Sequence, residues 1–244
     1  MQLLKPEWPA PKNIKAYTTL KTSWGKYTSQ HSFNGSNSLN TDPEFVSENN
    51  KLKSLLGINT DPIWVRQTHS NTVIEACDAN REKNADATFT GQEKNVCAIL
   101  TADCLPLLIC DTQGTKVAAI HAGWRGLAAG IIENTLTALS LNPEQMLVWL
   151  GPAIGPNKFE VGQDVYEIFV SQDASAIQAF KPISANKWLA NLYTLAKMRL
   201  NYQGVNNIFG GNFCTYSQED LFFSYRRDKT QTGRLASLIW IDNG

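Results

Sequence analysis

The chain has 244 residues, of which 43% are hydrophobic and 18% charged, a composition typical of an ordinary globular protein. Its 22 lysine and arginine residues balance 22 aspartate and glutamate residues, so no net field attracts nucleic acid or an anionic membrane. No apolar run reaches the roughly 18 residues of a membrane-spanning helix, and the segment MQLLKPEWPAPKNIKAY lacks the apolar core of a secretory signal.

The cysteines and the lack of linkers indicate a cytoplasmic protein with one domain. The five cysteines are odd in number, scattered and free of any CxxC pair, which is not the pattern of a disulfide framework. No repeat, charge block or Pro/Gly/Ser linker divides the chain. We therefore expect a single domain over residues 1–244.

The N-terminal third contains a long polar loop and then a helix. Lys21 to Asn40 is rich in Ser, Thr, Asn and Gly and is predicted to be a loop. In the helix that follows, Asp42 can act as the N-cap, Pro43 suits the first turn and Gly57 ends the helix.

The rest of the chain alternates apolar runs that predict strands with segments of helical spacing. Helices are predicted at about Leu127–Leu139, Gln163–Ser171 and Trp188–Tyr202. Strands are predicted at residues 62–67, 72–76, 96–100, 106–110, 116–121, in the run QMLVWLG, and near 205–209, 221–226 and 235–241. The strand, helix, strand order around Leu127–Leu139 predicts one crossover in a mixed sheet, and the whole pattern predicts an α+β fold.

Three metal-ligand residue types lie where predicted strands meet turns: His69 in RQTHSNT, Cys104 in TADCLP and His121 in AIHAGWRG. Two imidazoles and one thiolate suit zinc, and three protein ligands leave a fourth position open for water or substrate, as in catalytic zinc sites. The spacings of 35 and 17 residues match no zinc finger. In the plainer alternative, Cys104 is a small buried hydrophobic residue and the histidines are core residues with satisfied hydrogen bonds. The residues alone do not decide between these.

Five motifs in order resemble the signature blocks of one family: QTHSNTV, TADCLPLLICD, HAGWRGLAAGII, GPAIGPNKFEVG and FFSYRRDKTQTGRLASLIWI. The resemblance, from about Ile14 to the C-terminus, is to the YfiH-type laccase-domain family. Older descriptions label its members polyphenol oxidases and newer ones purine nucleoside phosphorylases.

The resemblance implies a fold, a metal site and an activity. The fold would be a single-domain four-layer α-β-β-α sandwich with mixed sheets, and His69, Cys104 and His121 would be the metal ligands. The implied chemistry is phosphorolysis of adenosine, inosine and S-methyl-5′-thioadenosine, with some adenosine deamination. The implied partners are a nucleoside and phosphate, in a monomer or homodimer.

The residues that each activity needs help to choose among the activities attributed to this family. A multicopper oxidase needs many histidines, whereas this chain has three, so copper is possible but disfavoured and zinc is expected. The usual nucleobase deaminases use H-x-E and P-C-x-x-C, and neither pattern occurs here. Any deamination would therefore need a different set of residues.

Phosphorolysis requires groups that bind an anion near the proposed metal. Arg125, in the turn of HAGWRG ahead of a helix, is the first candidate for binding phosphate, with a surface ion pair as its alternative. Arg226 and Arg227 come next, unless they pair with Asp228. Asp103 is a candidate to orient a histidine ligand or to cap a turn. Gln67 is a candidate to contact the base or to pack.

Two other functions use the same residues. Cys104 as nucleophile and His121 as base would make a cysteine hydrolase, including a peptidoglycan-precursor editing amidase, but such a pair has no evident use for His69. A non-catalytic metal-binding module is the third possibility, and an open coordination position argues against it.

This chain also departs from the family pattern. Leu20, in TTLKTSWGKY, stands where relatives commonly have arginine, in a loop expected to contact substrate. Asn157 replaces a common cysteine and Asn191 a common aspartate. We expect these changes to affect specificity more than chemistry.

Overall fold

The computed structural model describes residues 3–24 and 42–243. Most of the loop predicted over Lys21–Asn40 lies outside these residues. No helix within the described residues has both the length and the apolar character needed to cross a membrane.

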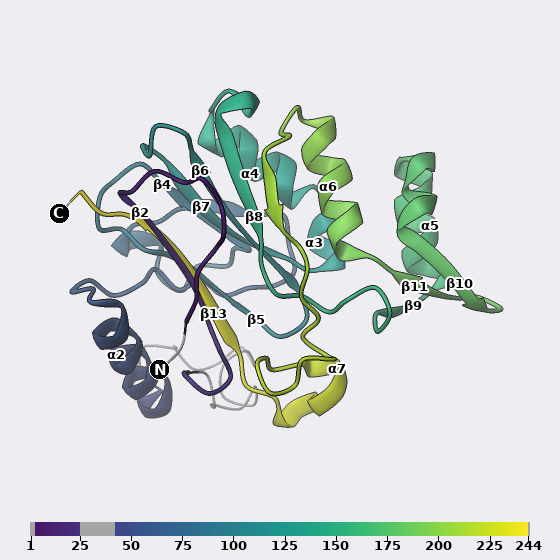
Figure 1. Ribbon diagram of the computed structural model, residues 1–244, viewed down its shortest axis with the longest axis horizontal. Coiled ribbons are helices and arrows are strands. Elements are labelled where there is room, and N and C mark those ends of the chain that lie inside the picture. The colour runs from purple at the N-terminus through teal and green to yellow at the C-terminus, as the bar shows by residue number, and fades with distance from the viewer. Residues whose placement is uncertain (1–2, 25–41, 244) are drawn as a thin grey trace.

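A six-stranded mixed sheet lies at the centre of the molecule (Figure 1), in the order β12-β8-β6-β7-β4-β3. Its strands β6 and β7 are buried along their whole length, which explains their nearly continuous apolar sequences. Strand β6 is antiparallel to both β7 and β8, so β7 and β8 run parallel to one another and the predicted crossover is confirmed. The bounds are β3 Val73–Glu75, β4 Ala87–Thr90, β6 Leu105–Asp111, β7 Val117–Ala122, β8 Met146–Leu150 and β12 Ile208–Gly210.

A second, four-stranded sheet packs face to face on the first. Its order is β1-β2-β13-β5, and its bounds are β1 Leu3–Leu4, β2 Ile14–Thr19, β5 Cys97–Thr101 and β13 Leu235–Ile241. Buried side chains from both sheets form the core between them, among them Ile99 and Ile239 on one side and Leu108 and Trp149 on the other.

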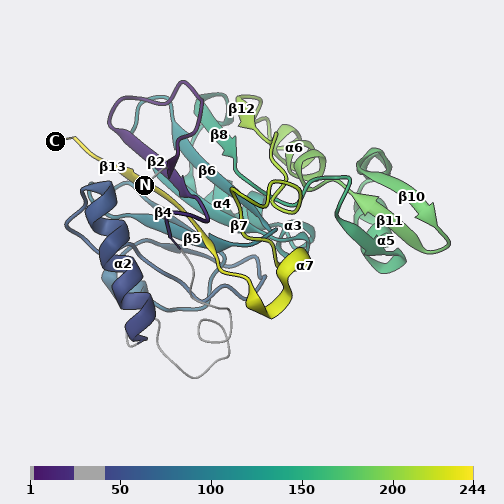
Figure 2. The same cartoon turned by 60° about the horizontal axis from the view of Figure 1, so that its bottom comes forward.

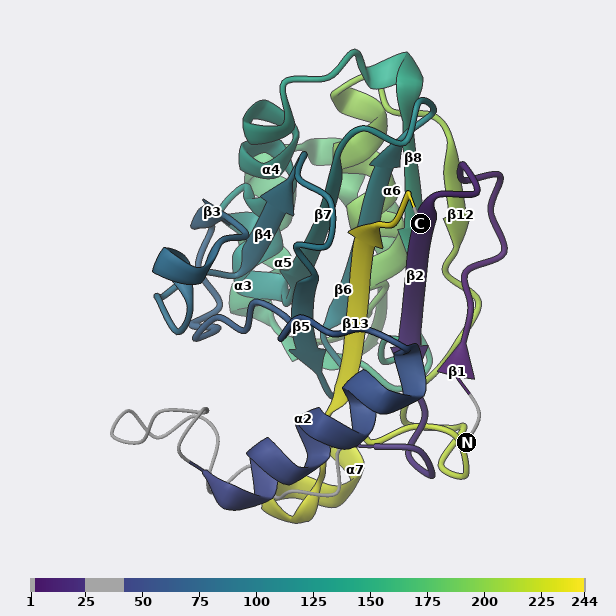
Figure 3. The same ribbon diagram turned by 90° about the vertical axis from the view of Figure 1, so that its left-hand side faces the viewer.

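Helices cover the two outer faces of the paired sheets. Helix α2 (Pro43–Leu56) packs on the smaller sheet (Figure 3). There its Phe45 and Leu52 belong to one buried cluster with Trp64 and Leu238. Helices α3 (Trp124–Ala128), α4 (Ile131–Leu139) and α6 (Leu192–Tyr202) pack on the larger sheet. The layers are thus helix, sheet, sheet and helix, and the expected four-layer α-β-β-α arrangement is confirmed.

A small unit projects from one side of this sandwich (Figure 2). It consists of a three-stranded antiparallel sheet, in the order β10-β11-β9, together with helix α5. The bounds are β9 Glu160–Gly162, α5 Gln163–Gln172, β10 Phe180–Ser184 and β11 Lys187–Ala190. Tyr166 stacks on Trp188 at a centroid distance of 3.9 Å and so ties the helix to the sheet.

The ends predicted for the first helix are confirmed. The Asp42 carboxylate accepts hydrogen bonds from the backbone N–H groups of Glu44 and Phe45, and Gly57 takes the left-handed conformation (φ 67°) that ends the helix.

Several predicted elements were wrong in detail. Residues 62–67 form only isolated bridges at Ile63 and Arg66. The segment predicted as a strand at 221–226 is a turn leading into the short helix α7 (Tyr225–Asp228), whose first turn is capped by Ser224. The helix predicted from Trp188 starts at Leu192, because residues 187–190 form strand β11, which pairs with β9 and β10. Gly130, at φ 89°, divides the helix predicted at Leu127–Leu139 into α3 and α4. Strands β1, β2, β4, β9 and β10 were not predicted.

Candidate metal centre and active site

Strands β6 and β7 bring Cys104 and His121 together. Leu105 pairs with Ala122 and Pro106 with His121, so Cys104, one residue before β6, lies beside the end of β7. Two adjacent strands of a buried sheet are a rigid support for functional side chains. The convergence of this thiol and this imidazole thus follows directly from the strand register.

His69 reaches the same point from a turn that a buried carboxylate holds in place. It has a left-handed backbone (φ 60°), which is uncommon for a residue with a side chain. The Asp86 carboxylate accepts the backbone N–H groups of Thr68, His69 and Ser70, at 3.1, 3.0 and 2.6 Å. These bonds offset the cost of the strained turn.

The three donor atoms lie close enough to share one metal ion. The Cys104 Sγ to His69 Nε2 distance is 3.8 Å, and the ligand atoms of His69, Cys104 and His121 all lie within 4.8 Å of one another. Zinc bonds of about 2.0–2.3 Å in a tetrahedron place donors roughly 3.3–3.7 Å apart, so only small movements are needed. His69 is exposed, Cys104 half-buried and His121 buried, so the group opens to solvent on the His69 side.

Asp86 also orients the buried histidine. His121 Nδ1 lies 2.7 Å from the Asp86 carboxylate, which leaves Nε2 of His121 as the atom that can coordinate a metal. Burial tends to raise the Asp86 pKa, but the bonds from His121 and Ser70 outweigh it and lower that pKa to about 2. Asp86 is therefore an anion that accepts hydrogen bonds from both sides of the site.

The thiol and imidazole influence one another's protonation. Burial opposes ionisation of Cys104, yet the nearby His121 charge and hydrogen bonds from both imidazoles lower its pKa to about 6. Burial likewise disfavours the charged form of His121, whereas the Cys104 thiolate and the Asp86 carboxylate raise its pKa to about 9. Both shifts favour a thiolate on Cys104 beside an imidazolium on His121.

The donors open onto a cavity of about 620 Å³, called the site cavity below. Most of the residues predicted for the site line it: Gln67, His69, Asp103, Cys104, His121, Arg125 and Arg226. Gly123 lies against the donors, since a Cβ there would be 2.9 Å from His69 Cδ2 and 3.1 Å from Cys104 Sγ. The glycine leaves the donors the room they need.

Two of the predicted arginines, Arg125 and Arg226, bring positive charge to the cavity wall. The Arg125 guanidinium is exposed and stacks on the Trp124 ring at 4.2 Å. No carboxylate among the described residues lies within ion-pairing distance of Arg125, so the surface ion pair considered as its alternative role is not observed there. Arg226 donates to the carbonyl of Glu160 and lies 5.5 Å from the Phe159 ring.

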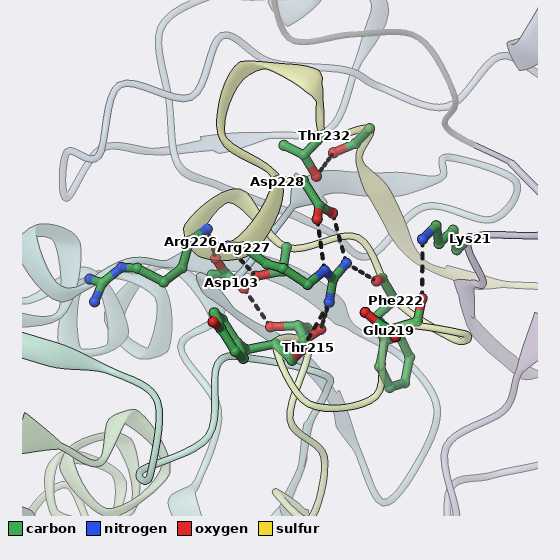
Figure 4. Close-up of polar contacts among 12 residues, drawn as sticks. Lys21, Asp103, Thr215, Glu219, Phe222, Arg226, Arg227, Asp228 and Thr232 are labelled. Carbon is green, nitrogen blue, oxygen red and sulfur yellow. Dashed lines mark hydrogen bonds and ion pairs between the residues drawn. The ribbon is translucent and has the colours of Figure 1, made fainter.

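Asp103 organises the backbone beside Cys104 (Figure 4). Its carboxylate accepts hydrogen bonds from the Thr215 hydroxyl and the Arg226 backbone N–H, both at 2.6 Å, and its own backbone is left-handed (φ 90°). Asp86, and not Asp103, makes the hydrogen bond to the histidine. Asp103 thus has the second role considered for it, holding a turn.

Arg227 and Gln67 are occupied by contacts within the protein. The Arg227 guanidinium pairs with Asp228 and donates to backbone carbonyls, including that of Phe222, and Arg227 does not line the site cavity. It therefore stabilises the turn around α7 (Figure 4). The Gln67 amide lines the cavity but bonds both the N–H and the carbonyl of Leu100, at 2.7 Å each.

The departures from the family pattern fall outside the site cavity. Leu20 is buried against Phe222, Phe223 and Leu235. Asn157 and Asn191 line a separate cavity of about 390 Å³, and Asn191 caps helix α6. The remainder of the altered loop, residues 25–41, lies outside the described residues.

Several residues at the site were not predicted. Asp86 is the most important, and its segment NADATFT gave no signal for this role, because strand β4, which begins at Ala87, was itself not predicted. Trp124, Phe159, Tyr225 and Arg234 also line the cavity. Their motifs were recognised, but nothing in the sequence showed which side chains would face inward.

A family model described as multi-copper polyphenol oxidoreductase laccase matches residues 17–242. The chain belongs to this family. Its laccase domain therefore covers nearly the whole sequence, as the five ordered motifs indicated.

Curated relatives in this family carry a different label. The Escherichia coli K12 protein named purine nucleoside phosphorylase YfiH is 45% identical over 242 residues, covering 98% of this chain and 99% of its own. A Haemophilus influenzae protein named purine nucleoside phosphorylase is 44% identical, covering 99% and 100%. A crystal structure of a Neisseria meningitidis protein shares 42% identity with a TM-score of 0.87, covering both chains completely.

The donor set of this laccase-domain protein fits a single metal ion. The observations that support the fit are the spacing of the donors, the carboxylate on His121 Nδ1 and the room left by Gly123. Only two histidines lie in the described part of the chain, and both are in this group. These residues fit one mononuclear centre.

Proposed function

We propose that this protein is a zinc-dependent purine nucleoside phosphorylase, acting on adenosine, inosine and S-methyl-5′-thioadenosine, with adenosine deamination as a side activity. The observation that carries the proposal is the convergence of His69, Cys104 and His121 on an open cavity with arginines in its wall. The names of the curated relatives support the same activity. The catalytic unit would be the single domain, residues 1–244.

In phosphorolysis, a phosphate oxygen attacks the ribose C1′, the bond from C1′ to the purine nitrogen breaks, and the purine leaves with a proton. Arg125 has an exposed guanidinium, which suits it to bind and orient the phosphate. Arg226, across the cavity wall, adds a second positive charge. Holding two reactants in one cavity removes much of the entropic barrier to their reaction.

Aromatic side chains offer a surface for the purine. Trp124, Phe159 and Tyr225 line the site cavity, and a flat purine ring stacks favourably on such faces. His69, Cys104 and His121 would hold the zinc. When bound, zinc supplies a Lewis acid that can polarise a phosphate oxygen or a water molecule. Asp86 keeps His121 in the tautomer that presents Nε2.

We also propose a cytoplasmic location and a monomer or homodimer as the assembly. The five cysteines, all described, form no disulfide bond, in keeping with a reducing compartment. The neutral net charge suits a small-molecule substrate better than nucleic acid.

The test measures bound metal and the products formed from inosine, with and without phosphate. Wild type is expected to contain zinc and to release hypoxanthine and ribose 1-phosphate only when phosphate is present. Cys104→Ser is expected to lose both metal and activity. Cys77→Ser, which alters a half-buried cysteine outside the site cavity, is the matched control and should behave as wild type. Hypoxanthine release that does not depend on phosphate would contradict the proposal.

One observation favours a second candidate, a cysteine hydrolase or amidase. Cys104, His121 and Asp86 form a series of thiolate, imidazole and orienting carboxylate, the arrangement of a nucleophile with its base. His69 separates the two candidates. A hydrolase of this kind would cleave an amide without phosphate, in the presence of chelators and in His69→Ala, whereas the phosphorylase would lose its activity in each case.

A further inference from the structure

Asp86 connects two segments that each carry a histidine donor. It is completely buried, and it lies opposite His121 in the antiparallel pairing of β4 with β7, where Ala87 pairs with Ile120. The Asp86 backbone carbonyl accepts the His121 N–H at 2.7 Å, and its side chain accepts His121 Nδ1. The backbone and the side chain of one residue thus fix the histidine on β7.

The same carboxylate holds the turn that carries the second histidine. Besides the three backbone N–H groups of residues 68–70, Asp86 Oδ2 accepts the Ser70 hydroxyl at 2.7 Å. These bonds hold His69 in its left-handed conformation and so determine where its ring lies. With the backbone of His69 fixed, its Nε2 faces Cys104 Sγ.

We propose that Asp86 is the positioning residue for both histidine donors and preorganises the centre before a metal binds. The inference rests on the proposed function, because it takes His69, Cys104 and His121 to hold a metal ion. Asp86 does not line the site cavity and acts through the histidines. The third donor, Cys104, is held independently by its place at the start of β6.

A neutral amide cannot replace this carboxylate without conflict. Asp86 accepts hydrogen bonds on both oxygens, from His121 and His69 on Oδ1 and from the Ser70 backbone and hydroxyl on Oδ2. In Asp86→Asn, one of these oxygens becomes an NH₂ group. On that side of the amide, the NH₂ group faces N–H or O–H groups that also donate hydrogen bonds, so no acceptor is left for them. Either the His121 ring or the turn carrying His69 must then move.

The test is a titration of the metal-free protein with Co²⁺, followed by the visible and near-ultraviolet absorption of the cobalt–thiolate centre. Asp86→Asn is expected to bind Co²⁺ about 10–100-fold more weakly, with a changed spectrum because the donors are no longer in place. Near-ultraviolet circular dichroism checks that the variant is folded.

Asp111→Asn is the matched control. Asp111 is also a buried carboxylate that holds a turn, accepting the backbone N–H groups of Thr115 and Lys116 and the Thr115 hydroxyl, but it lies outside the site cavity. Both variants are expected to lose stability, and only Asp86→Asn should lose cobalt affinity. Equal losses of affinity in the two variants would overturn the inference, as would a wild-type spectrum and affinity in Asp86→Asn.

Ser70→Ala provides a test if Asp86→Asn does not fold. It removes the hydroxyl bond to Asp86 Oδ2 and the bond that the same hydroxyl accepts from the Thr72 N–H, and it leaves the backbone bonds to Asp86 in place. We expect a loss of cobalt affinity of about 2–10-fold. An unchanged affinity in this variant would then overturn the inference. A wild-type protein that binds no Co²⁺ would instead contradict the proposed metal site itself, so the two failures are distinguishable.

Discussion

One donor residue and the neighbour of another adopt backbone conformations that side chains disfavour. His69 and Asp103 both have positive φ, and neither is a glycine. Each is fixed by a carboxylate: Asp86 binds the turn of His69, and the side chain of Asp103 binds Thr215 and the start of α7. Such strain persists only where surrounding contacts determine it, and it is concentrated at functional sites.

Gly123→Ala should weaken metal binding without unfolding the protein. The new Cβ would lie 2.9 Å from His69 Cδ2, and because His69 is exposed its ring can move away at little cost. That movement takes Nε2 out of place, so we expect metal affinity to fall by at least about tenfold. Competition with a chromogenic chelator measures the affinity. Gly91→Ala, in a turn outside the site cavity, should keep wild-type affinity, and an unchanged affinity in Gly123→Ala would contradict the expectation.

Arg125→Ala should raise the KM for phosphate and leave the metal content unchanged. A charged hydrogen bond contributes about 1.5–3 kcal/mol, so kcat/KM for phosphate should fall about 10–100-fold. Steady-state kinetics at saturating inosine measure this. Lys181→Ala removes an exposed positive charge from strand β10 and should have no effect. Loss of metal in Arg125→Ala would mean that this arginine supports the site in some other way.

The three candidate donors could be selected from the sequence, whereas the residues that support them could not. His69, Cys104 and His121 are candidates from the sequence because histidine and cysteine are common metal ligands. Asp86 has no such signal, because its partners lie 16 to 35 positions away along the chain and only the folded sheets bring them together. For Arg227 the motif left two roles open, a ligand contact or a pairing with Asp228, and the structure has the pairing.

At the scale of elements, buried strands were predicted best. Strands β5 to β8 are nearly continuous apolar runs with both faces covered, which is a strong local signal. The prediction for the segment of strand β11 was wrong because Trp188 and Leu189 also fit helical spacing. In the structure they pair with β9 and are extended. Strand β4, Ala87–Thr90, is short and half polar, so its identity depends on its neighbours β7 and β3.

Asp42→Ala tests whether the outer helix is independent of the site. Removing this N-cap leaves the N–H groups of Glu44 and Phe45 without their acceptor, and should lower the free energy of unfolding by about 1 kcal/mol. Urea denaturation measures the change. Helix α2 covers the smaller sheet and contributes no residue to the site cavity, so metal content and activity should stay at wild-type values. A loss of either would show that α2 affects the site.

At the scale of the molecule, the site depends on the assembled sandwich. The cavity lining comes from six separate stretches, which include residues 67–69, 100–104, 121–125 and 225–226. These stretches belong to both sheets and to the turns at one end of the molecule. A metal ion held by three of them should therefore stabilise the whole fold.

Zinc should raise the melting temperature of the metal-free protein. A ligand at 100 times its Kd adds about 2.7 kcal/mol to the stability of the native state, which corresponds to roughly 5–10 °C for a chain of this size. Differential scanning fluorimetry with increasing zinc measures the shift. In Cys104→Ser the shift should disappear. A shift of equal size in that variant would place the stabilising zinc elsewhere.

Anomalous X-ray diffraction tests the central claim most directly, because it locates a metal by element and by position. Crystals of the zinc-loaded protein, measured on both sides of the zinc absorption edge, should show one strong peak per chain. The peak should lie about 2.0–2.1 Å from one nitrogen each of His69 and His121 and about 2.3 Å from Cys104 Sγ. Zinc found only at other positions would contradict the account, as would intact crystals with no zinc between these three side chains.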